Sequence, residues 1–269
     1  MGFRFVRTKS MAEYIVEIET LQGGSIKTLV DALKELLTDT CITFDDAGMR
    51  ISTMDRNHIL LVHLRLHADR FETYRCERET SIGLNVLLLH KITKSLTGSD
   101  VVQLRLDGSL NHLEMVVTNA EKASRTCYRI SLIDVDSPQI EIADASGLSE
   151  ITLPSAELSK LVRDMRCIGD FVEIVKTPEA LCFNCAGEFC ELNSVLDIDE
   201  ASRGDQGGVE EVIQGVFSLN YLCLFSKCSP LSSTVKLYLK NEYPLVVQYD
   251  VSSLGSIKLC LSPQVESSL

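Results

Sequence analysis

An internal repeat restricts the folds open to this chain more than any other feature of its sequence. Residues 26–37 place apolar side chains three and four positions apart, and residues 158–165 repeat this helical spacing in the second half. Residues 81–96 (SIGLNVLLLHKITKSL) align in the same way with residues 216–231 (VFSLNYLCLFSKCSPL), with a Leu-Asn pair in common. Each half therefore predicts two helices among short alternating strands, and we expect an α+β chain of two like domains.

The boundary between the two halves has the composition of a linker. Residues 132–149 contain several acids and serines together with a proline and a glycine. We therefore expect an N-terminal domain over residues 11–131 and a C-terminal domain over residues 150–269. Residues 1–10 form a basic extension that we expect to be disordered.

Composition and charge exclude several classes of protein. No apolar run approaches the roughly 18 residues of a membrane helix. Ten cysteines without a secretion signal favour a reducing compartment. The net charge of −12 means that the surface as a whole repels phosphate, so any contact with DNA requires a local group of Lys and Arg.

The sequence contains no pattern that predicts catalysis or a bound metal. It has no phosphate-binding loop, dinucleotide motif or nucleophile elbow. His63 and His67 fall on one face of an alternating strand, but no third ligand follows them. Cys182 and Cys185 would point to opposite faces of a strand, and Cys190 does not complete a zinc motif. We therefore expect neither an enzyme nor a cofactor.

The predicted helices carry basic side chains that lie largely off their apolar stripes. An ordinary solvated helix face explains any one of these residues. Their repetition on all four helices of an acidic chain favours a shared binding surface instead. The residues are Lys27, Lys34, Lys91, Lys94, Lys160, Arg163 and Lys227.

Several separate motifs occur in one order along the chain. Residues 48–74 (GMRISTMDRNHILLVHLRLHADRFETY) predict two strands around a turn, where apolar groups flank a polar loop. The other motifs are Leu84-Asn85 with Lys91 and Lys94, the linker residues Asp134-Val135-Asp136, and Pro230 to Val235. Through these motifs the chain, from about Glu13 to Pro263, resembles the eukaryotic-type DNA sliding clamp family, proliferating cell nuclear antigen.

This resemblance implies a DNA clamp fold and a ring. Two like domains per subunit would place helices inside and antiparallel sheets outside, and three identical subunits would encircle duplex DNA without reading its sequence. The chain would be a non-enzymatic polymerase processivity factor in replication and repair, in the nucleus or at a viral replication site. A clamp loader ATPase would open the ring, and DNA polymerases, ligases and nucleases would insert short peptides beneath the linker.

The resemblance also assigns residues to three surfaces. The basic residues named above would line the hole. The peptide pocket would comprise Met54, His58, Ile59, Leu61, Ile140, Ile142, Tyr243, Pro244, Ser262 and Pro263. Subunits would pair through strand edges at residues 125–131, with Cys127, Tyr128 and Arg129, and at residues 181–186, with Leu181, Phe183 and Cys185.

Some positions depart from the family pattern. Thr28 and Asn220 stand where the family often has basic residues, which lowers the expected charge of the hole. Glu141, Ala143 and Cys260 replace a glycine, a proline and an aromatic residue around the pocket, so we expect it to accept a different set of peptides.

Alternatives stay open for both function and sites. The chain could be a subunit of a heteromeric, checkpoint-type clamp, or a monomeric interaction protein that kept the clamp fold. The two interface segments could be ordinary core strands, and the linker isoleucines could serve only to pin the linker to its own domain. Self-assembly and retention on DNA distinguish the functions.

Overall fold

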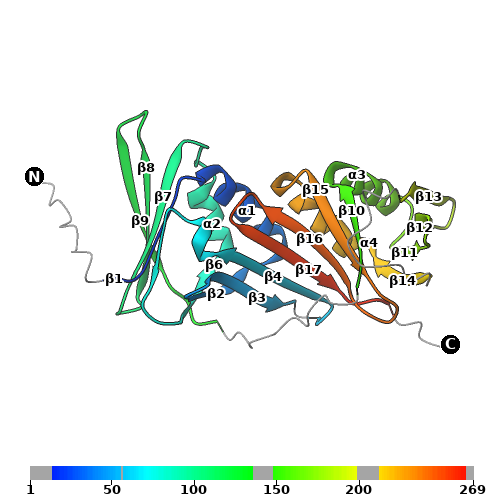
Figure 1. The fold of residues 1–269 in the computed structure, drawn as a ribbon, viewed down its shortest axis with the longest axis horizontal. Helices are drawn as coiled ribbons and strands as arrows, with labels where there is room; N and C mark the ends of the chain where they lie inside the picture. The colour runs from blue at the N-terminus through cyan, green and yellow to red at the C-terminus, as the bar shows by residue number, and fades with distance from the viewer. Residues whose placement is uncertain (1–13, 56, 136–147, 199–211, 265–269) are drawn as a thin grey trace, which may run out of the picture.

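The structure, a computed structural model, describes residues 14–55, 57–135, 148–198 and 212–264. Within these residues the chain forms an elongated body of three antiparallel sheets and four α-helices (Figure 1). The expected N-terminal extension, residues 1–10, lies outside the described residues.

A five-stranded sheet forms one end of the body (Figure 1). Its strand order is β5-β1-β7-β8-β9, so β9 lies at an edge as expected for residues 125–131. The strands are β1 (Tyr14–Thr20), β5 (Thr73–Cys76), β7 (Asp100–Asp107), β8 (His112–Asn119) and β9 (Ser124–Ser131).

An eight-stranded sheet crosses from the N-terminal to the C-terminal half, in the order β10-β15-β16-β17-β4-β3-β2-β6. The two halves meet where β17 pairs with β4, in a register that runs from Gly255 opposite Leu66 to Leu261 opposite Leu60. The strands are β2 (Asp39–Asp45), β3 (Gly48–Met54), β4 (Leu60–His67), β6 (Thr80–Asn85), β10 (Ser149–Pro154), β15 (Thr234–Leu239), β16 (Leu245–Val251) and β17 (Gly255–Leu261). The predicted strand-turn-strand unit of residues 48–74 is thus present as β3 and β4.

A four-stranded sheet at the other end corrects one expected interface edge. Its order is β13-β12-β11-β14, with strands β11 (Phe171–Lys176), β12 (Ala180–Ala186), β13 (Glu191–Asp197) and β14 (Ile213–Ser218). The prediction that residues 181–186 form an edge is wrong, because β12 is hydrogen-bonded on both sides. Its residues Leu181, Phe183 and Cys185 lie in the core. The edge strand is β13.

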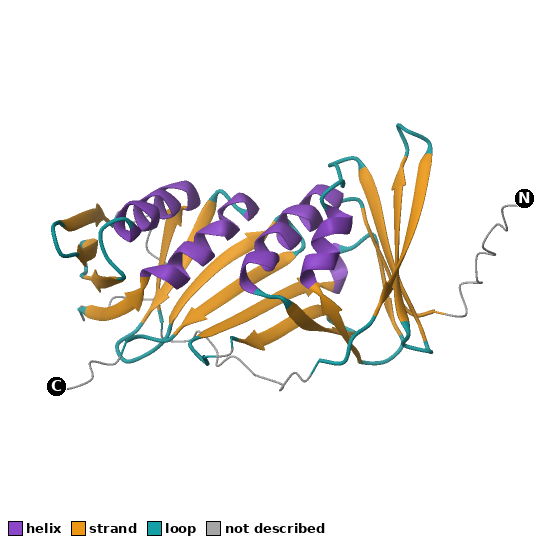
Figure 2. Cartoon of the chain, turned by 180° about the vertical axis from the view of Figure 1, so that it is seen from behind, coloured by secondary structure: helices purple, strands orange, loops and turns teal. Residues whose placement is uncertain are grey.

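All four helices lie side by side in front of the eight-stranded sheet (Figure 2). They are α1 (Gly23–Leu36), α2 (Val86–Thr93), α3 (Ser155–Arg166) and α4 (Leu219–Phe225), and the 3-10 helix η4 (Ser226–Leu231) continues α4. The helices predicted at residues 26–37 and 158–165 are confirmed as α1 and α3. Asn85 caps α2 by accepting a hydrogen bond from the backbone N–H of Leu88 at 2.8 Å.

The main hydrophobic core fills the space between the helices and the sheets. Alternation along β4 shows how it forms, since Leu60, Val62, Leu64 and Leu66 are buried beneath the helices while the residues between them face the other way. We call this opposite side of the eight-stranded sheet the outer face, and the exposed side of the helices the helical face. No helix among the described residues is long and apolar enough to cross a membrane.

Replacing Phe183 with Ala tests the position of β12. The side chain is 1% exposed, so its removal should lower the free energy of unfolding by about 3–5 kcal/mol. Phe171 on β11 is 46% exposed in the same sheet, and Phe171→Ala should cost only about 1 kcal/mol. Urea denaturation at one fixed protein concentration measures both. Similar losses in the two variants would contradict the buried position of β12.

Candidate nucleic-acid interface and partner pocket

The helical face carries exposed cations that form no ion pair within the described residues, although Glu157 and Asp164 are also exposed on α3. Lys91 on α2, Lys160 and Arg163 on α3, and Lys227 on η4 are exposed, as is Lys94 at the C-terminal cap of α2. Within the described residues, none of these side chains forms an ion pair or hydrogen bond. Their charged groups are therefore available to contact an external anion.

The two predicted basic residues of α1 are already engaged. Lys34 lies 3.8 Å from Asp31 and 3.3 Å from the imidazole Nε2 of His90 on α2. Lys27 donates a hydrogen bond to the backbone carbonyl of Leu96 at 3.3 Å. The sequence placed both lysines on one helix face but did not reveal these partners, which reduce the charge that α1 offers.

Asn220, which stands where the family often has a basic residue, holds another cation in place. Its side-chain oxygen accepts a hydrogen bond from Nε of Arg166 at 2.7 Å, and Arg166 also pairs with Asp170 at 2.9 Å. Arg166 thereby lies between α3 and α4 with part of its charge balanced. The helical face also exposes Leu87 and Leu88 on α2, which cannot bind phosphate.

The outer face carries a row of apolar side chains from opposite halves of the chain. Met54 lies opposite Leu61, Leu61 opposite Cys260, and Cys260 opposite Val246 in the strand register. The row continues to Tyr238 on β15. It therefore spans five strands and crosses the join between the two halves.

A small hydrophobic cluster, separate from the main core, forms around this row. Its buried members are Leu148, Val246 and Cys260, and Leu61, Tyr238 and Tyr243 pack against them. Burial raises the pKa of the Cys260 thiol to about 11, so Cys260 acts as a small apolar side chain. Sequence reasoning found Leu61 and Tyr243 but missed Val246, Tyr238 and Leu148. Alternation along β15 and β16 could have revealed the first two.

The turn between β3 and β4 is held by Asp55. Its Oδ1 accepts hydrogen bonds from the backbone N–H groups of Ile59 and Leu60 at 2.7 and 2.8 Å, and its Oδ2 accepts one from the Tyr221 hydroxyl of α4 at 2.8 Å. His58 adopts a left-handed backbone conformation, with a φ of 58°, at the tip of this turn. The turn is thus attached to a helix of the other half.

The structure brings most of the predicted pocket residues together. Ser262 donates its backbone N–H to the carbonyl of Ile59 at 3.0 Å, and the imidazole of His58 contacts Met54 Sδ at 3.0 Å. Pro244 follows Tyr243 at the start of β16, and Pro263 follows Ser262 after β17. The predicted pocket residues Ile140 and Ile142, with the departures Glu141 and Ala143, lie outside the described residues.

The two sheet edges that could join subunits differ in charge. On β9, Cys127 and Arg125 are exposed, Tyr128 packs partly against the core, and Arg129 pairs with Glu114 at 3.1 Å. On β13, Glu191 and Asp197 are exposed at the two ends, and Val195 is exposed between them.

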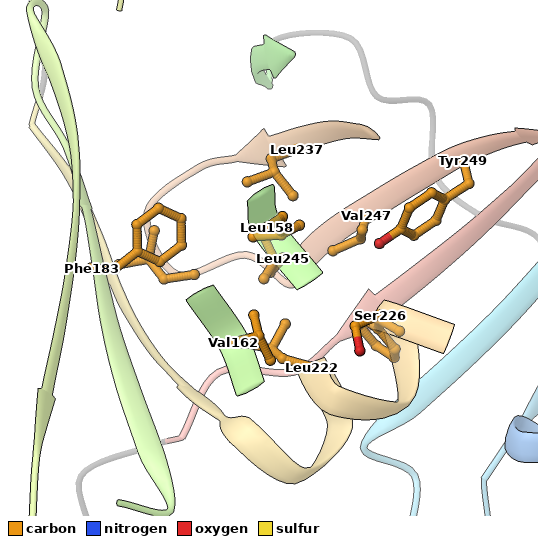
Figure 3. Close-up of a pocket in the computed structure, with 11 residues that line it drawn as sticks. Leu158, Val162, Phe183, Leu222, Ser226, Leu237, Leu245, Val247 and Tyr249 are labelled. Atoms are coloured by element: carbon orange, nitrogen blue, oxygen red, sulfur yellow. The ribbon is translucent and has the colours of Figure 1, made fainter. Parts of the chain in front are cut away.

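One enclosed cavity in the described part of the C-terminal half is too small for a substrate. Figure 3 shows a cavity whose lining includes Leu158, Val162, Leu222, Leu245 and Tyr249. Its volume is about 10 Å³, too small for anything larger than one water molecule. Cys182 and Cys185 lie on opposite faces of β12, as predicted from strand alternation.

Two family models together match almost the whole chain. The N-terminal domain model of proliferating cell nuclear antigen matches residues 15–139, and the C-terminal domain model matches residues 141–264. The chain belongs to the proliferating cell nuclear antigen family. It is also 36% identical over 255 residues to "Probable DNA polymerase sliding clamp 1" of Paramecium bursaria Chlorella virus 1, with 93% of this chain and 97% of that protein covered.

Membership of the proliferating cell nuclear antigen family confirms two predictions. The three sheets and four helices are the α+β clamp fold that the motifs indicated. Members of the family are sliding clamps that support polymerase processivity and are not enzymes, which agrees with the lack of catalytic motifs.

Replacing Asp55 with Asn tests how the β3–β4 turn is held. Burial acts to raise the pKa of Asp55. Hydrogen bonds from the Leu60 N–H, the Tyr221 hydroxyl and the Ile59 N–H outweigh this effect and lower the pKa below its ordinary value. The ionised carboxylate therefore stabilises the turn above the ordinary pKa of about 3.9, and this contribution is lost as pH falls through the lowered pKa.

Hydrogen exchange of the Ile59 and Leu60 amides measures this effect. In the wild type we expect the protection factors of these two amides to decrease when the pH is lowered below about 4. In Asp55→Asn we expect them to be low at every pH. The Val62 amide, in the middle of β4, serves as the control and should stay protected. Unchanged protection of Ile59 and Leu60 in the variant would mean that Asp55 does not hold the turn.

Proposed function

We propose that this sliding clamp closes as a homotrimer around duplex DNA and tethers replication and repair enzymes through its outer face. The observation that carries the proposal is the separation of charge, with unpaired cations on the helical face of a chain whose net charge is −12. Such a surface attracts phosphates without reading bases. Contacts of this kind exchange easily, which sliding requires, and encirclement would provide retention.

Ring closure would join β9 of one subunit to β13 of the next. Both are edge strands, and edge strands present backbone groups that another strand can pair with. β9 exposes Arg125 and β13 exposes Glu191 and Asp197, so the two edges attract each other. Head-to-tail contacts form a ring when the rotation between subunits closes. A closed ring needs to be opened before DNA enters, which implies a clamp loader ATPase.

Partner peptides would dock on the apolar row of the outer face. Met54 and Leu61 provide adaptable apolar contacts beside the polar turn that Asp55 holds. Cys260 stands where the family pattern has an aromatic residue, and its side chain is smaller. The centre of the row would therefore accept a bulkier side chain of the partner peptide than an aromatic residue at this position would allow. We propose that DNA polymerases, ligases and nucleases dock here, in the nucleus or at a viral replication site.

Native mass tests the homotrimer and the strands that join it. Light scattering should give about 90 kDa for the wild type, three times the 29.9 kDa of one chain. Arg125→Glu should dissociate the ring by placing like charges at the joint, and adding Glu191→Lys and Asp197→Lys should restore it. A mass near 30 kDa at every concentration would favour a heteromeric clamp or a monomeric interaction protein.

Two lysine variants test the helical face. Lys160→Ala should reduce the salt dependence of binding to short duplex DNA by about 0.9 in the log–log slope, which is the loss of one phosphate contact. Lys34→Ala is the matched control and should change the slope less, because Lys34 is already paired with Asp31 and Glu35. Fluorescence anisotropy at several salt concentrations measures both. Equal slopes for Lys160→Ala and the wild type would show that Lys160 does not contact DNA phosphates.

A further inference from the structure

Two cationic or potentially cationic side chains on the outer face lack partners. His63 on β4 and Lys258 on β17 lie directly opposite each other in the strand register. Residues so placed have Cβ atoms roughly 5 Å apart. Nδ1 of His63 is buried without a hydrogen bond, and Lys258 forms neither an ion pair nor a hydrogen bond in the described part of the chain.

The other cations on this part of the outer face have anions beside them. Arg65 donates to both carboxylate oxygens of Asp45, at 3.1 and 3.2 Å. The remaining pairs are Arg50 with Glu79, and Lys236 with Glu150 at 2.8 Å. In the described part of this face, His63 and Lys258 are thus two adjacent nitrogen-bearing side chains without an acceptor, and a buried nitrogen without one, such as Nδ1 of His63, is uncommon in folded proteins.

Their position relates them to the proposed partner pocket. His63 lies two residues after Leu61 on β4, and Lys258 lies two residues before Cys260 on β17. Side chains two apart on a strand share a face, so the pair lies immediately beside the centre of the apolar row. A peptide seated on that row would carry its neighbouring side chains over His63 and Lys258.

The surroundings of His63 favour an added negative charge. The titratable groups that face it among the described residues are Arg50 on β3, Arg65 on β4, and Lys258 and Cys260 on β17. Burial, followed by Lys258, Arg65 and Arg50, lowers the pKa of His63, so the imidazole is neutral at pH 7. An anion beside it would oppose this effect and allow His63 to become a second charged donor.

We infer that His63 and Lys258 form a subsite for a carboxylate side chain of the docked partner peptide. This inference rests on the proposed docking of peptides on the apolar row. The Lys258 ammonium supplies the charge and His63 a second donor, while the apolar row supplies the anchor. Because the chain as a whole is acidic, an acidic peptide is repelled elsewhere, and this subsite selects where its carboxylate lies.

Two sets of short synthetic peptides with the same aliphatic and aromatic anchors test the subsite. One set carries Glu in turn at each position next to the anchors, and the other carries Gln there. Calorimetry with the full-length clamp should show one position where Glu binds about tenfold tighter than Gln. Lys258→Met should abolish that difference. Lys236→Met is the matched control, because Lys236 has the same charge on the same face but is paired with Glu150, and should preserve it.

The pH dependence provides a second measurement. Protonation of His63 on binding would make the affinity of the Glu peptide rise as pH falls from 8 to 6, while the Gln peptide stays constant. His63→Gln keeps a donor but removes the titration. It should therefore retain most of the preference for Glu and lose its dependence on pH.

The outcomes separate this inference from the proposed pocket. Equal binding of Glu and Gln peptides at all positions overturns the carboxylate subsite and leaves the pocket in place. Failure of every peptide to bind overturns both. A Glu preference that survives Lys258→Met overturns the assignment of the carboxylate to His63 and Lys258.

Discussion

The antiparallel pairing of β4 with β17 is the interaction on which the rest of the structure depends. It joins strands from the two halves into one eight-stranded sheet, with Ile257, Leu259 and Leu261 facing Leu60, Val62 and Leu64 beneath the helices. The contact is close, since a Cβ at Gly255 would lie 2.0 Å from the Arg65 carbonyl oxygen. Because this sheet is continuous, the helices of both halves share one side and the apolar row of the other side crosses the join (Figure 2).

Charge on the helical face is shaped by local partners as much as by composition. α1 and α3 have the same helical spacing and similar numbers of basic residues, but Lys34 faces Asp31 and His90 whereas Lys160 and Arg163 face solvent. The two halves of this clamp would therefore attract DNA unequally. If the chain closes into the proposed ring, its other, mostly acidic surfaces would repel phosphates, and modest contacts inside the ring would then suffice.

On the outer face, recognition would combine an apolar row with polar side chains fixed by hydrogen bonds. Asp55 ties the β3–β4 turn to α4, and Ser262 ties the end of β17 to the same turn. Both halves therefore fix the turn beside the apolar row, and a surface held in this way would lose less entropy if a peptide docked on it as proposed. His63 and Lys258 would add a charge preference beside the apolar row, on a face whose other described cations are paired with carboxylates.

The sequence by itself determined the duplicated α+β fold, two helices per half and the positions of the basic residues, because these follow from local periodicity and repetition. Through the resemblance it also grouped Met54 and Leu61, which the structure places opposite each other on β3 and β4. Only the tertiary structure decided that β13, and not β12, is the sheet edge, since strand order depends on pairings between distant residues that alternation does not encode. For the same reason it alone revealed the partners of Lys34 and the missing partners of His63 and Lys258.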